Sequence, residues 1–469
     1  MNSKLGIALI TSLGELIMDT STLSFKTSKL AGGVEYRRAI LVLLLLCPII
    51  STLVYIARYG VNVPFLDDWL FIEFMQKYMS QGITLHDLFA QHNESRILFP
   101  RLVMLGLALA TRYSSLAQMY LNWVIMCLSA LIIFSIYRKT IGTSQPALLQ
   151  FLPIVALLFS WRQNDNWLAG FQMVMFMAEL ALLCSFALLA KSETPDRYFF
   201  GAIAAALIAS FSFINGLFLW PIGLFQVWRK ERDRAEHGKR SGHHLSLIWG
   251  LIGLGVWTLY MIGYRGPRQH PSLTIAIEHP VQALEYFFSI IGSPLIMKRY
   301  PAIATGLLLV SFGIYSYGAR FKKPTDLSFW DSLIIFTLLT AASITVGRVG
   351  FGVEQALDSR YTTFATLGII GLHVRLLSMA LRWQIRDGLI YAVFVGVIAL
   401  GVGVSTLYGA YRGTATKRMR EKDANALRTF RDQSDDRLTK LFPNLEKLKR
   451  LAPFLEEQKW NVFENANSR

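Results

Sequence analysis

The residues best suited to chemistry include an acidic pair, Asp67-Asp68, that follows the first apolar stretch of the chain. Neighbouring carboxylates repel each other, and one of such a pair tends to have a raised pKa, which suits a general base or a cation site. The simpler alternative is a turn or helix start, where an Asp side chain accepts backbone N–H bonds. Both residues are therefore candidate catalytic bases, and the local sequence does not rank them.

A second polar stretch, residues 91–101, belongs to the same long segment. It combines a titratable His92 and a carboxylate at Glu94 with two guanidinium groups, Arg96 and Arg101. Arg suits phosphate recognition because its planar fork donates two parallel charge-assisted hydrogen bonds. We interpret these four residues as candidate substrate-binding groups, with an ordinary charged loop near lipid headgroups as the alternative.

Three further segments, residues 161–167, 213–216 and 347–361, are also polar and aromatic. Arg side chains there could hold a lipid phosphate, and Trp and Asn side chains commonly stack on and hydrogen-bond to sugars. The alternatives are an interfacial belt of Trp residues and an Arg that snorkels to the membrane surface. The candidate binding residues in these segments are Asn166, Trp167, Asn215, Arg348, Arg360 and Tyr361.

Membrane-spanning helices are the elements that must position these residues. Of the 469 residues, 53% are hydrophobic. A spanning helix needs about 20 mostly apolar residues, because the bilayer core offers no water to an exposed backbone. The sequence therefore predicts an all-α polytopic membrane protein with about eleven spans. We place them at residues 39–57, 116–137, 147–160, 171–190, 198–214, 216–228, 245–263, 301–318, 331–347, 361–381 and 388–408.

The distribution of charge predicts on which side of the membrane the candidate residues lie. The net charge is +16, and the basic residues form short clusters between the apolar stretches. The predicted cytoplasmic loops contain about twice as many Lys and Arg as Asp and Glu, as the positive-inside rule expects. This predicts an inside N-terminus, an outside C-terminus and a site on the outer face. The charge reflects topology, so nucleic acid is not an expected partner.

Three regions follow from this topology. Residues 1–38 are a predicted cytoplasmic tail without a cleavable signal pattern, residues 39–408 the transmembrane domain, and residues 409–469 a charged tail outside. Two outer loops of the domain are too long for simple connectors. The first, residues 58–115, contains apolar patches that predict helices along the membrane surface. The second, residues 264–300, contains a patch at 286–296 that is too short to span and could be re-entrant.

With these features the sequence resembles the integral-membrane glycosyltransferases of the GT-C fold, which include protein O-mannosyltransferases and lipid A aminoarabinose transferases. The resemblance rests on the first span, the long outer loop that opens with the acidic pair, and the segments at residues 92–96, 166–172 and 358–361. It implies transfer of a sugar from a polyprenyl-phosphate carrier to a glycan, lipid or protein acceptor, at the outer face of a bacterial inner membrane.

The resemblance also implies roles for individual residues. Asp67 or Asp68 would be the general base, and the Arg residues would stabilise the phosphate that leaves. A divalent cation that bridges the acidic pair and a phosphate stays an open alternative, and no other cofactor is expected. The sequence departs from the mannosyltransferases because it has no His-Pro-Pro motif.

Two other classes of protein stay open. A lipid-linked saccharide transporter would place ionisable residues within the spans, where Glu179 is the conspicuous case. A ligase or polymerase of surface polysaccharide would also work outside the membrane, but with its catalytic residues in a later outer loop.

Overall fold

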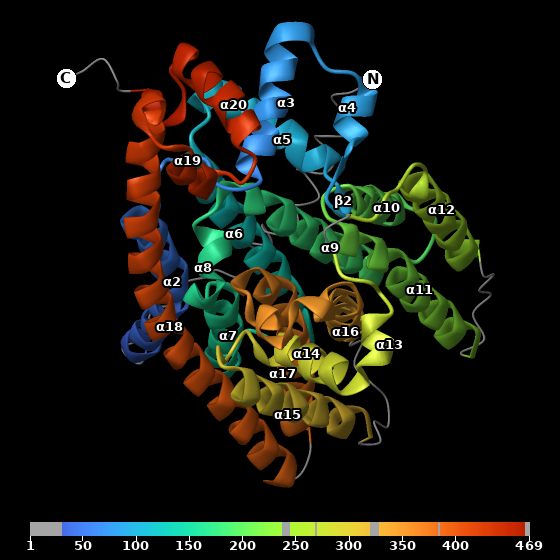
Figure 1. Cartoon of the computed structure of the whole chain (residues 1–469). Coiled ribbons are helices and arrows are strands. Elements are labelled where there is room, and N and C mark those ends of the chain that lie inside the picture. Colours follow the sequence, from blue (N-terminus) through green and yellow to red (C-terminus); the bar gives the residue numbers. More distant parts are fainter. Residues whose placement is uncertain (1–30, 237–243, 268–269, 319–327, 383–384, 465–469) are drawn as a thin grey trace.

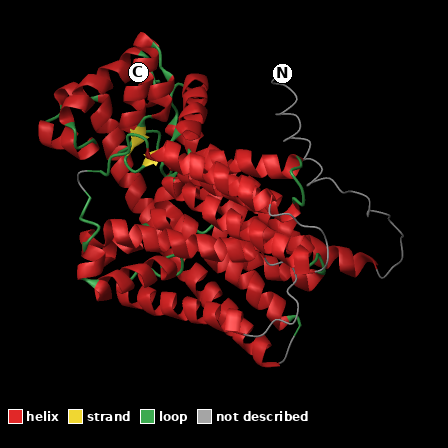
Figure 2. Cartoon of the chain, turned by 90° about the vertical axis from the view of Figure 1, so that its right-hand side faces the viewer, coloured by secondary structure: helices red, strands yellow, loops and turns green. Residues whose placement is uncertain are grey.

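The computed structural model describes the chain except for residues 1–30, 237–243, 268–269, 319–327, 383–384 and 465–469. Most of the predicted N-terminal tail and parts of three predicted cytoplasmic loops therefore lie outside the described residues. The described chain is helical apart from one hairpin of two short strands, so the predicted all-α class is confirmed (Figures 1 and 2).

Eight helices of the described chain are long and apolar enough to cross a membrane, which makes this a multi-pass membrane protein. Apolar side chains cover their outer faces, for example Leu43, Leu254 and Leu400, which are 66%, 66% and 69% exposed. Such exposure suits contact with lipid. The eight helices are α2 (Ala31–Tyr59), α6 (Ser115–Thr140), α9 (Met173–Lys191), α12 (His244–Met261), α15 (Arg299–Gly318), α16 (Ser328–Arg348), α17 (Thr362–Ala380) and α18 (Ile385–Arg428).

The three other predicted spans also form helices, but these do not reach the same length and hydropathy. They are α7 (Gln145–Leu158), α10 (Arg197–Ser210) and α11 (Leu219–Glu236). The 14 residues of α7 and of α10 extend about 21 Å, less than the roughly 30 Å of bilayer hydrocarbon, and the second half of α11 is charged. The total of eleven spans therefore stays a prediction.

The first outer loop folds into three helices and the hairpin. The helices predicted along the membrane surface correspond to α3 (Asp68–Gln81) and α5 (Leu98–Thr111), and α4 (Leu85–Phe89) lies between them. The hairpin joins β1 (Gln91–His92) to β2 (Ser95–Arg96), which are antiparallel. The sequence did not predict this hairpin, because strands of two residues leave no alternating pattern to read.

Short helices follow the ends of several spans. In the second outer loop, α13 (Ile275–Glu278) precedes α14 (Pro280–Gly292), and the apolar patch at 286–296 is the end of α14 and the turn after it. With 13 residues, α14 is not among the membrane-length helices. The remaining short elements are α8 (Asn164–Trp167) and the 3-10 helices η1 (Trp161–Gln163), η2 (Gly170–Gln172), η3 (Ile214–Phe218), η4 (Val349–Phe351), η5 (Val353–Leu357) and η6 (Ser359–Tyr361).

The C-terminal segment folds back onto the first outer loop. Helix α18 continues past the predicted end of the last span at residue 408 and ends at Arg428. It is followed by η7 (Phe430–Asp432), α19 (Asp435–Leu441), α20 (Leu445–Glu457) and η8 (Asn461–Phe463). In Figure 1, α19 and α20 lie beside α3 and α5, and Figure 2 shows the strands at the same end of the bundle. The predicted tail and the first loop therefore lie at the same end of the helix bundle.

Candidate active site

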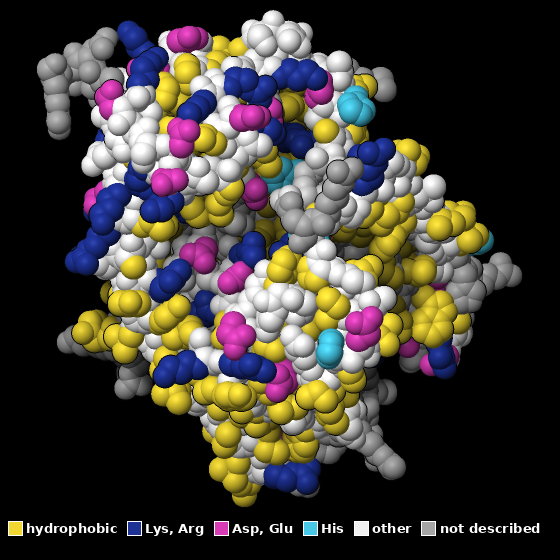
Figure 3. All heavy atoms as spheres, viewed as in Figure 1, with side chains coloured by type: hydrophobic (Ala, Val, Ile, Leu, Met, Phe, Trp, Pro, Cys, Tyr) yellow, Lys and Arg dark blue, Asp and Glu magenta, His cyan; other side chains and the backbone are white. Residues whose placement is uncertain are grey.

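A cavity of about 480 Å³ lies between the first loop and the ends of the spans. Figure 3 shows a hollow in the middle of the surface that faces the viewer, with basic and acidic side chains around it. The cavity collects residues from the hairpin, η3, the loop after α12, the end of α16 and η6. Seven of the predicted site residues line it: Asp67, His92, Glu94, Asn215, Arg348, Arg360 and Tyr361.

The two acidic residues of the pair have different surroundings. Asp67 lines the cavity, and its side chain is 44% exposed. Asp68 is 1% exposed, and its carboxylate accepts hydrogen bonds from the Phe65 N–H at 2.8 Å and the Tyr113 hydroxyl at 3.2 Å. Burial raises the pKa of Asp68 to about 6. Asp68 therefore belongs to the packing of α3, and Asp67 is the carboxylate that a substrate can reach.

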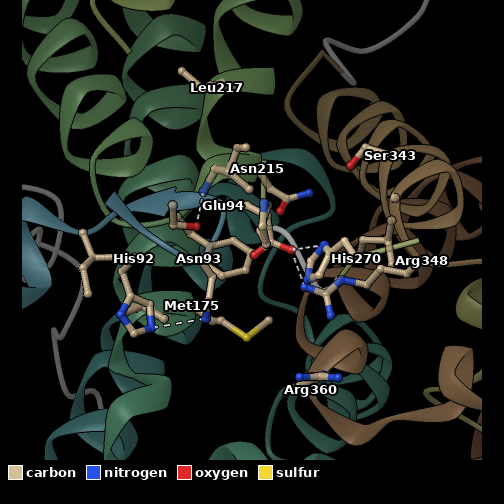
Figure 4. A pocket seen from close by; sticks show the side chains of 18 of the residues that line it. His92, Asn93, Glu94, Met175, Asn215, Leu217, His270, Ser343, Arg348 and Arg360 are labelled. Carbon is tan, nitrogen blue, oxygen red and sulfur yellow. Dashed lines mark hydrogen bonds and ion pairs between the residues drawn. The ribbon is translucent and has the colours of Figure 1, made fainter. Parts of the chain in front are cut away.

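His92 adjoins Asp67 at the edge of the cavity. Its Nε2 lies 3.5 Å from Oδ2 of Asp67, and its ring packs on Phe171 with the centroids 4.8 Å apart. The chain reverses after His92 because Asn93 adopts a left-handed conformation (φ 48°), which Asn tolerates better than most residues. The hairpin thereby presents His92 and Glu94 in different directions (Figure 4).

Glu94 forms an ionic cluster on the other side of the hairpin. Its Oε1 accepts a short hydrogen bond from Nη2 of Arg348, at the end of α16, and lies 3.3 Å from Nδ1 of His270. Burial lowers the pKa of His270, and Arg348 and Arg360 lower it further against the opposing effect of Glu94. The imidazole is therefore neutral at neutral pH. His270 was not predicted, although it belongs to the second loop that the sequence marked as too long for a connector.

Arg360 and Asn215 line the cavity, and each has a side-chain nitrogen without a partner among the described residues. These atoms are Nε of Arg360 and Nδ2 of Asn215, both shielded from solvent. Nη2 of Arg360 donates to Asp358 at 2.8 Å, which leaves Nη1 of the guanidinium group for a ligand. Buried donors normally have partners, and these two nitrogens would reach a ligand only if their side chains turned toward the cavity.

Close packing at Gly216 places Asn215 at the cavity wall. A Cβ at Gly216 would lie 2.1 Å from the carbonyl oxygen of Ala209, so only glycine allows η3 to approach α10 this closely. The neighbouring Ile214 N–H donates to Oγ of Ser95 at 3.1 Å and joins this turn to the hairpin. Asn215 was a predicted binding residue in the segment 213–216.

The two Arg residues predicted in the first loop do not line the cavity. Arg96 donates to the carbonyl groups of Tyr260 at 2.9 Å, Phe89 at 2.8 Å and Ile262 at 2.5 Å. Arg101 donates to carbonyl groups at the end of α4, at 2.9 Å to Leu88 and 2.5 Å to Ala90. Both guanidinium groups therefore stabilise the backbone that carries the hairpin.

Asn166 and Trp167 are also buried outside the cavity lining. Nδ2 of Asn166 donates to Oγ1 of Thr363 at 2.7 Å and lies 3.4 Å from the carbonyl oxygen of Arg360. The indole of Trp167 donates to the carbonyl of Ser160 at 3.0 Å. Asn166 thus supports the turn that carries Arg360, and Trp167 holds the turn at Ser160, so both lie behind the cavity surface.

Much of the cavity wall is apolar. Side chains of α9, η3, α12, α16 and α17 form it, including Val174, Met175, Leu217, Phe218, Trp257, Met261, Ile344 and Phe364. A cavity with an apolar wall and a few convergent charged groups suits an amphiphilic ligand with an anionic head. The described residues contain no group of three or more His, Cys, Asp or Glu side chains placed to hold a metal ion. The carboxylates of Asp67 and Asp68 have separate surroundings, so they do not form one cation site.

Fold and site together define a multi-pass membrane protein with a largely apolar cavity that also contains a few charged groups. No family model and no curated protein match the sequence. Among solved structures, the chain is similar to one described as "Crystal Structure of ArnT from Cupriavidus metallidurans bound to Undecaprenyl phosphate". The match has a TM-score of 0.42 and 11% sequence identity, and it covers 91% of this chain and 89% of that chain. A similarity of this strength carries no functional conclusion.

Proposed function

We propose that the protein is a membrane glycosyltransferase of the GT-C type, which moves a sugar from a polyprenyl-phosphate carrier to an acceptor on the outer face of the membrane. The observation that supports this most strongly is the arrangement of charges in the cavity. His92 lies on one side of the hairpin, and Arg348 lies on the other (Figure 4). Asp67 lies next to His92. A base and a phosphate site thus border the same space.

The cavity offers a suitable place for each part of such a donor. The apolar wall suits the first isoprene units of the carrier, and Arg348 and Arg360 suit its phosphate, since guanidinium groups bind phosphate through charge-assisted hydrogen bonds. The side-chain amide of Asn215, a residue that lines the cavity, suits a sugar hydroxyl once it turns toward the ligand. The sugar then lies between the phosphate site and Asp67.

In the proposed reaction, Asp67 takes the proton of an acceptor hydroxyl while that oxygen attacks the anomeric carbon. The bond between the anomeric carbon and the phosphate oxygen breaks, and polyprenyl phosphate leaves with the electron pair. A single displacement inverts the configuration at the anomeric carbon. Asp67 is accessible and close to His92, which can orient it, so it suits this role better than the buried Asp68.

Arg348 and Arg360 would act on the leaving group. Charge accumulates on the phosphate as the glycosidic bond breaks, and fixed cations in a site shielded from water stabilise that charge. In the structure, Arg348 is paired with Glu94 and Arg360 with Asp358. A bound phosphate would compete with these carboxylates for the guanidinium groups.

Transfer of labelled sugar by the purified protein in nanodiscs tests the proposal. Polyprenyl-phosphate sugars are supplied as donors, and the products are glycosylated acceptor and free polyprenyl phosphate. A transporter would instead move the intact donor across a vesicle membrane without breaking its glycosidic bond. A polysaccharide ligase or polymerase would require an assembled glycan on its carrier and would not use a single sugar.

A further inference from the structure

Residues 409–464 of the C-terminal segment pack on both flanks of Asp67. The extension of α18 contacts the end of α2 and Phe65, which precede Asp67, and α20 contacts α3, which follows Asp67. The segment was predicted only as a charged tail with helical spacing. Its contacts indicate that it holds part of the first loop in position.

The flank before Asp67 lies against the extension of α18. Nζ of Lys417 donates to the carbonyl of Arg58 at 2.9 Å. The guanidinium carbon of Arg420, a residue that is only 7% exposed, lies 3.0 Å from the ring centroid of the partly exposed Phe65. A cation held over an aromatic face is attracted to it, and more so away from water. Phe65 thus has a fixed position two residues before Asp67.

The flank after Asp67 lies against α20 and the turn before it. The ring of Phe442 stacks on Trp69, with the centroids 6.1 Å apart. One carboxylate of α3, Glu73, is paired with Lys447 at 2.7 Å and with Arg450 through a short hydrogen bond. Isolated helices of this length are marginal in water, so α3 depends on such packing for its position.

Asn461 joins the end of the segment to both sides of the first loop. Its side-chain amide donates to Oδ1 of Asn62 at 3.1 Å, to the carbonyl of Tyr113 at 2.7 Å and to Oγ of Ser115 at 3.1 Å. Tyr113 in turn donates to the buried carboxylate of Asp68. A chain of hydrogen bonds therefore runs from the last described turn to the residue beside Asp67.

Asp67 itself has few restraints of its own. It precedes the first residue of α3, and its side chain makes no capping hydrogen bond. Leu66 before it adopts a left-handed conformation (φ 45°), which persists only where the surroundings impose it. The position of Asp67 is thus set by its two flanks, and His92 contacts its carboxylate.

We infer that the C-terminal segment is a positioning element for Asp67, holding the loop before it and the helix after it so that the carboxylate faces the cavity. This inference rests on the proposed function, in which Asp67 is the base. The distance between reacting groups controls rate steeply, and a displacement of about 1 Å can cost roughly a hundredfold in rate. The segment is then required for turnover without touching the substrate.

Charge reversal at Glu73 in the full-length protein tests the inference. Glu73→Lys places a cation against Lys447 and Arg450, so α20 is repelled from α3. We expect kcat to fall roughly tenfold or more, while the KM for the donor stays within about twofold, because the cavity residues that hold the donor are unchanged. The triple variant Glu73→Lys/Lys447→Glu/Arg450→Glu restores opposite charges and should recover most of kcat.

Lys449→Glu is the matched control. Lys449 lies on the same helix but is paired with Asp435 within the segment, at 2.6 Å, so its reversal should leave kcat near the wild-type value. A loss in Lys449→Glu equal to that in Glu73→Lys, or a triple variant no better than the single one, would overturn the inference. Melting temperatures of all variants identify any that fail to fold.

Hydrogen exchange of residues 62–75 gives a readout that does not depend on activity. The exchange rate of these residues should rise in Glu73→Lys and return to the wild-type value in the triple variant. Faster exchange with unchanged kcat would overturn the inference and leave the proposed function intact. A wild-type protein that transfers no sugar would remove the proposed function and the catalytic part of the inference, and exchange would still decide whether the segment holds the loop.

Discussion

Nε2 of His92 lies 3.5 Å from Oδ2 of Asp67 at the edge of the cavity, and the His92 side chain is only 10% exposed. Packing on Phe171 fixes the imidazole, while Asp67 remains accessible from the cavity. This arrangement resembles the general pattern in which a catalytic base is oriented by a second polar group. In the proposed mechanism, His92 is therefore the partner that orients the base.

Replacement of His92 should reduce turnover. His92→Gln removes the imidazole but keeps a polar side chain of similar reach, so the hairpin should still fold. We expect kcat to fall roughly tenfold to a hundredfold, because positioned acid–base groups contribute about that much or more. The measurement is steady-state transfer of labelled sugar. His86→Gln is the control, since His86 is exposed on the same loop; equal losses in the two variants would argue against the role.

Replacement of Arg360 should weaken use of the phosphate donor. Arg360→Gln removes the charge, and Arg360→Lys keeps the charge but not the planar fork, so the loss should be larger for Gln. A charge-assisted hydrogen bond contributes about 1.5–3 kcal/mol, so kcat/KM should fall roughly tenfold to a hundredfold in Arg360→Gln. Arg299→Gln is the control, because Arg299 pairs with Glu285 and Glu354 and does not line the cavity. Unchanged kcat/KM in Arg360→Gln would remove Arg360 from the phosphate site.

Ionisation of Asp68 should make stability depend on pH. Its pKa is raised from 3.8 to about 6 in the folded protein. The stability that the protonated Asp68 carboxyl group contributes is therefore fully present below pH 3.8, and it is lost as the pH rises through about 6. A shift of this size is linked to at most about 3 kcal/mol in the free energy of unfolding.

Asp68→Asn should remove that pH dependence and leave the fold intact. The amide oxygen can accept from the Phe65 N–H, and the amide nitrogen can donate to the Tyr113 oxygen. Melting temperatures between pH 4 and pH 8 are the measurement, with Asp436→Asn on the exposed surface as the control. The slope of melting temperature against pH should become shallower in Asp68→Asn and stay unchanged in Asp436→Asn. A marked loss of stability at pH 8 would contradict the account, because it would require the ionised carboxylate.

Loss of the Arg96 side chain should destabilise the hairpin. Arg96→Ala leaves three carbonyl groups without their donor, and each partly buried group left unsatisfied costs about 1–3 kcal/mol. We expect a lower melting temperature together with loss of transfer, since the hairpin carries His92 and Glu94. Arg265→Ala is a matched control, because the Arg265 contacts to Gln91 use its backbone. A melting temperature equal to that of the wild type would show that the hairpin does not depend on Arg96.

Much of the fold could be predicted from the sequence, because the thickness of the bilayer sets the length of a spanning helix. The surface helices α3 and α5 were also predicted, and seven candidate residues from four distant segments line one cavity. Their grouping could be anticipated because all lay in loops predicted on the same side of the membrane.

The rest depends on tertiary packing that leaves no local pattern. Asp67 and Asp68 differ because only one is covered by Tyr113, whose ring comes from another part of the chain. Arg96 and Arg101 have the residue type of phosphate ligands, yet carbonyl groups surround them. The docking of α20 on α3 near Trp69 and Glu73 likewise could not be predicted, because the two surfaces that meet lie far apart in the sequence.

The comparison of Asp67→Asn with Asp68→Asn tests the central claim most directly. Both variants, with the wild type, are measured for transfer of labelled sugar from polyprenyl-phosphate donors in nanodiscs, and donor binding and melting temperature are recorded alongside. The account predicts that Asp67→Asn binds the donor but loses transfer by about two orders of magnitude or more, while Asp68→Asn retains most of it. Transfer that is indifferent to Asp67→Asn, or that is lost only in Asp68→Asn, would contradict it.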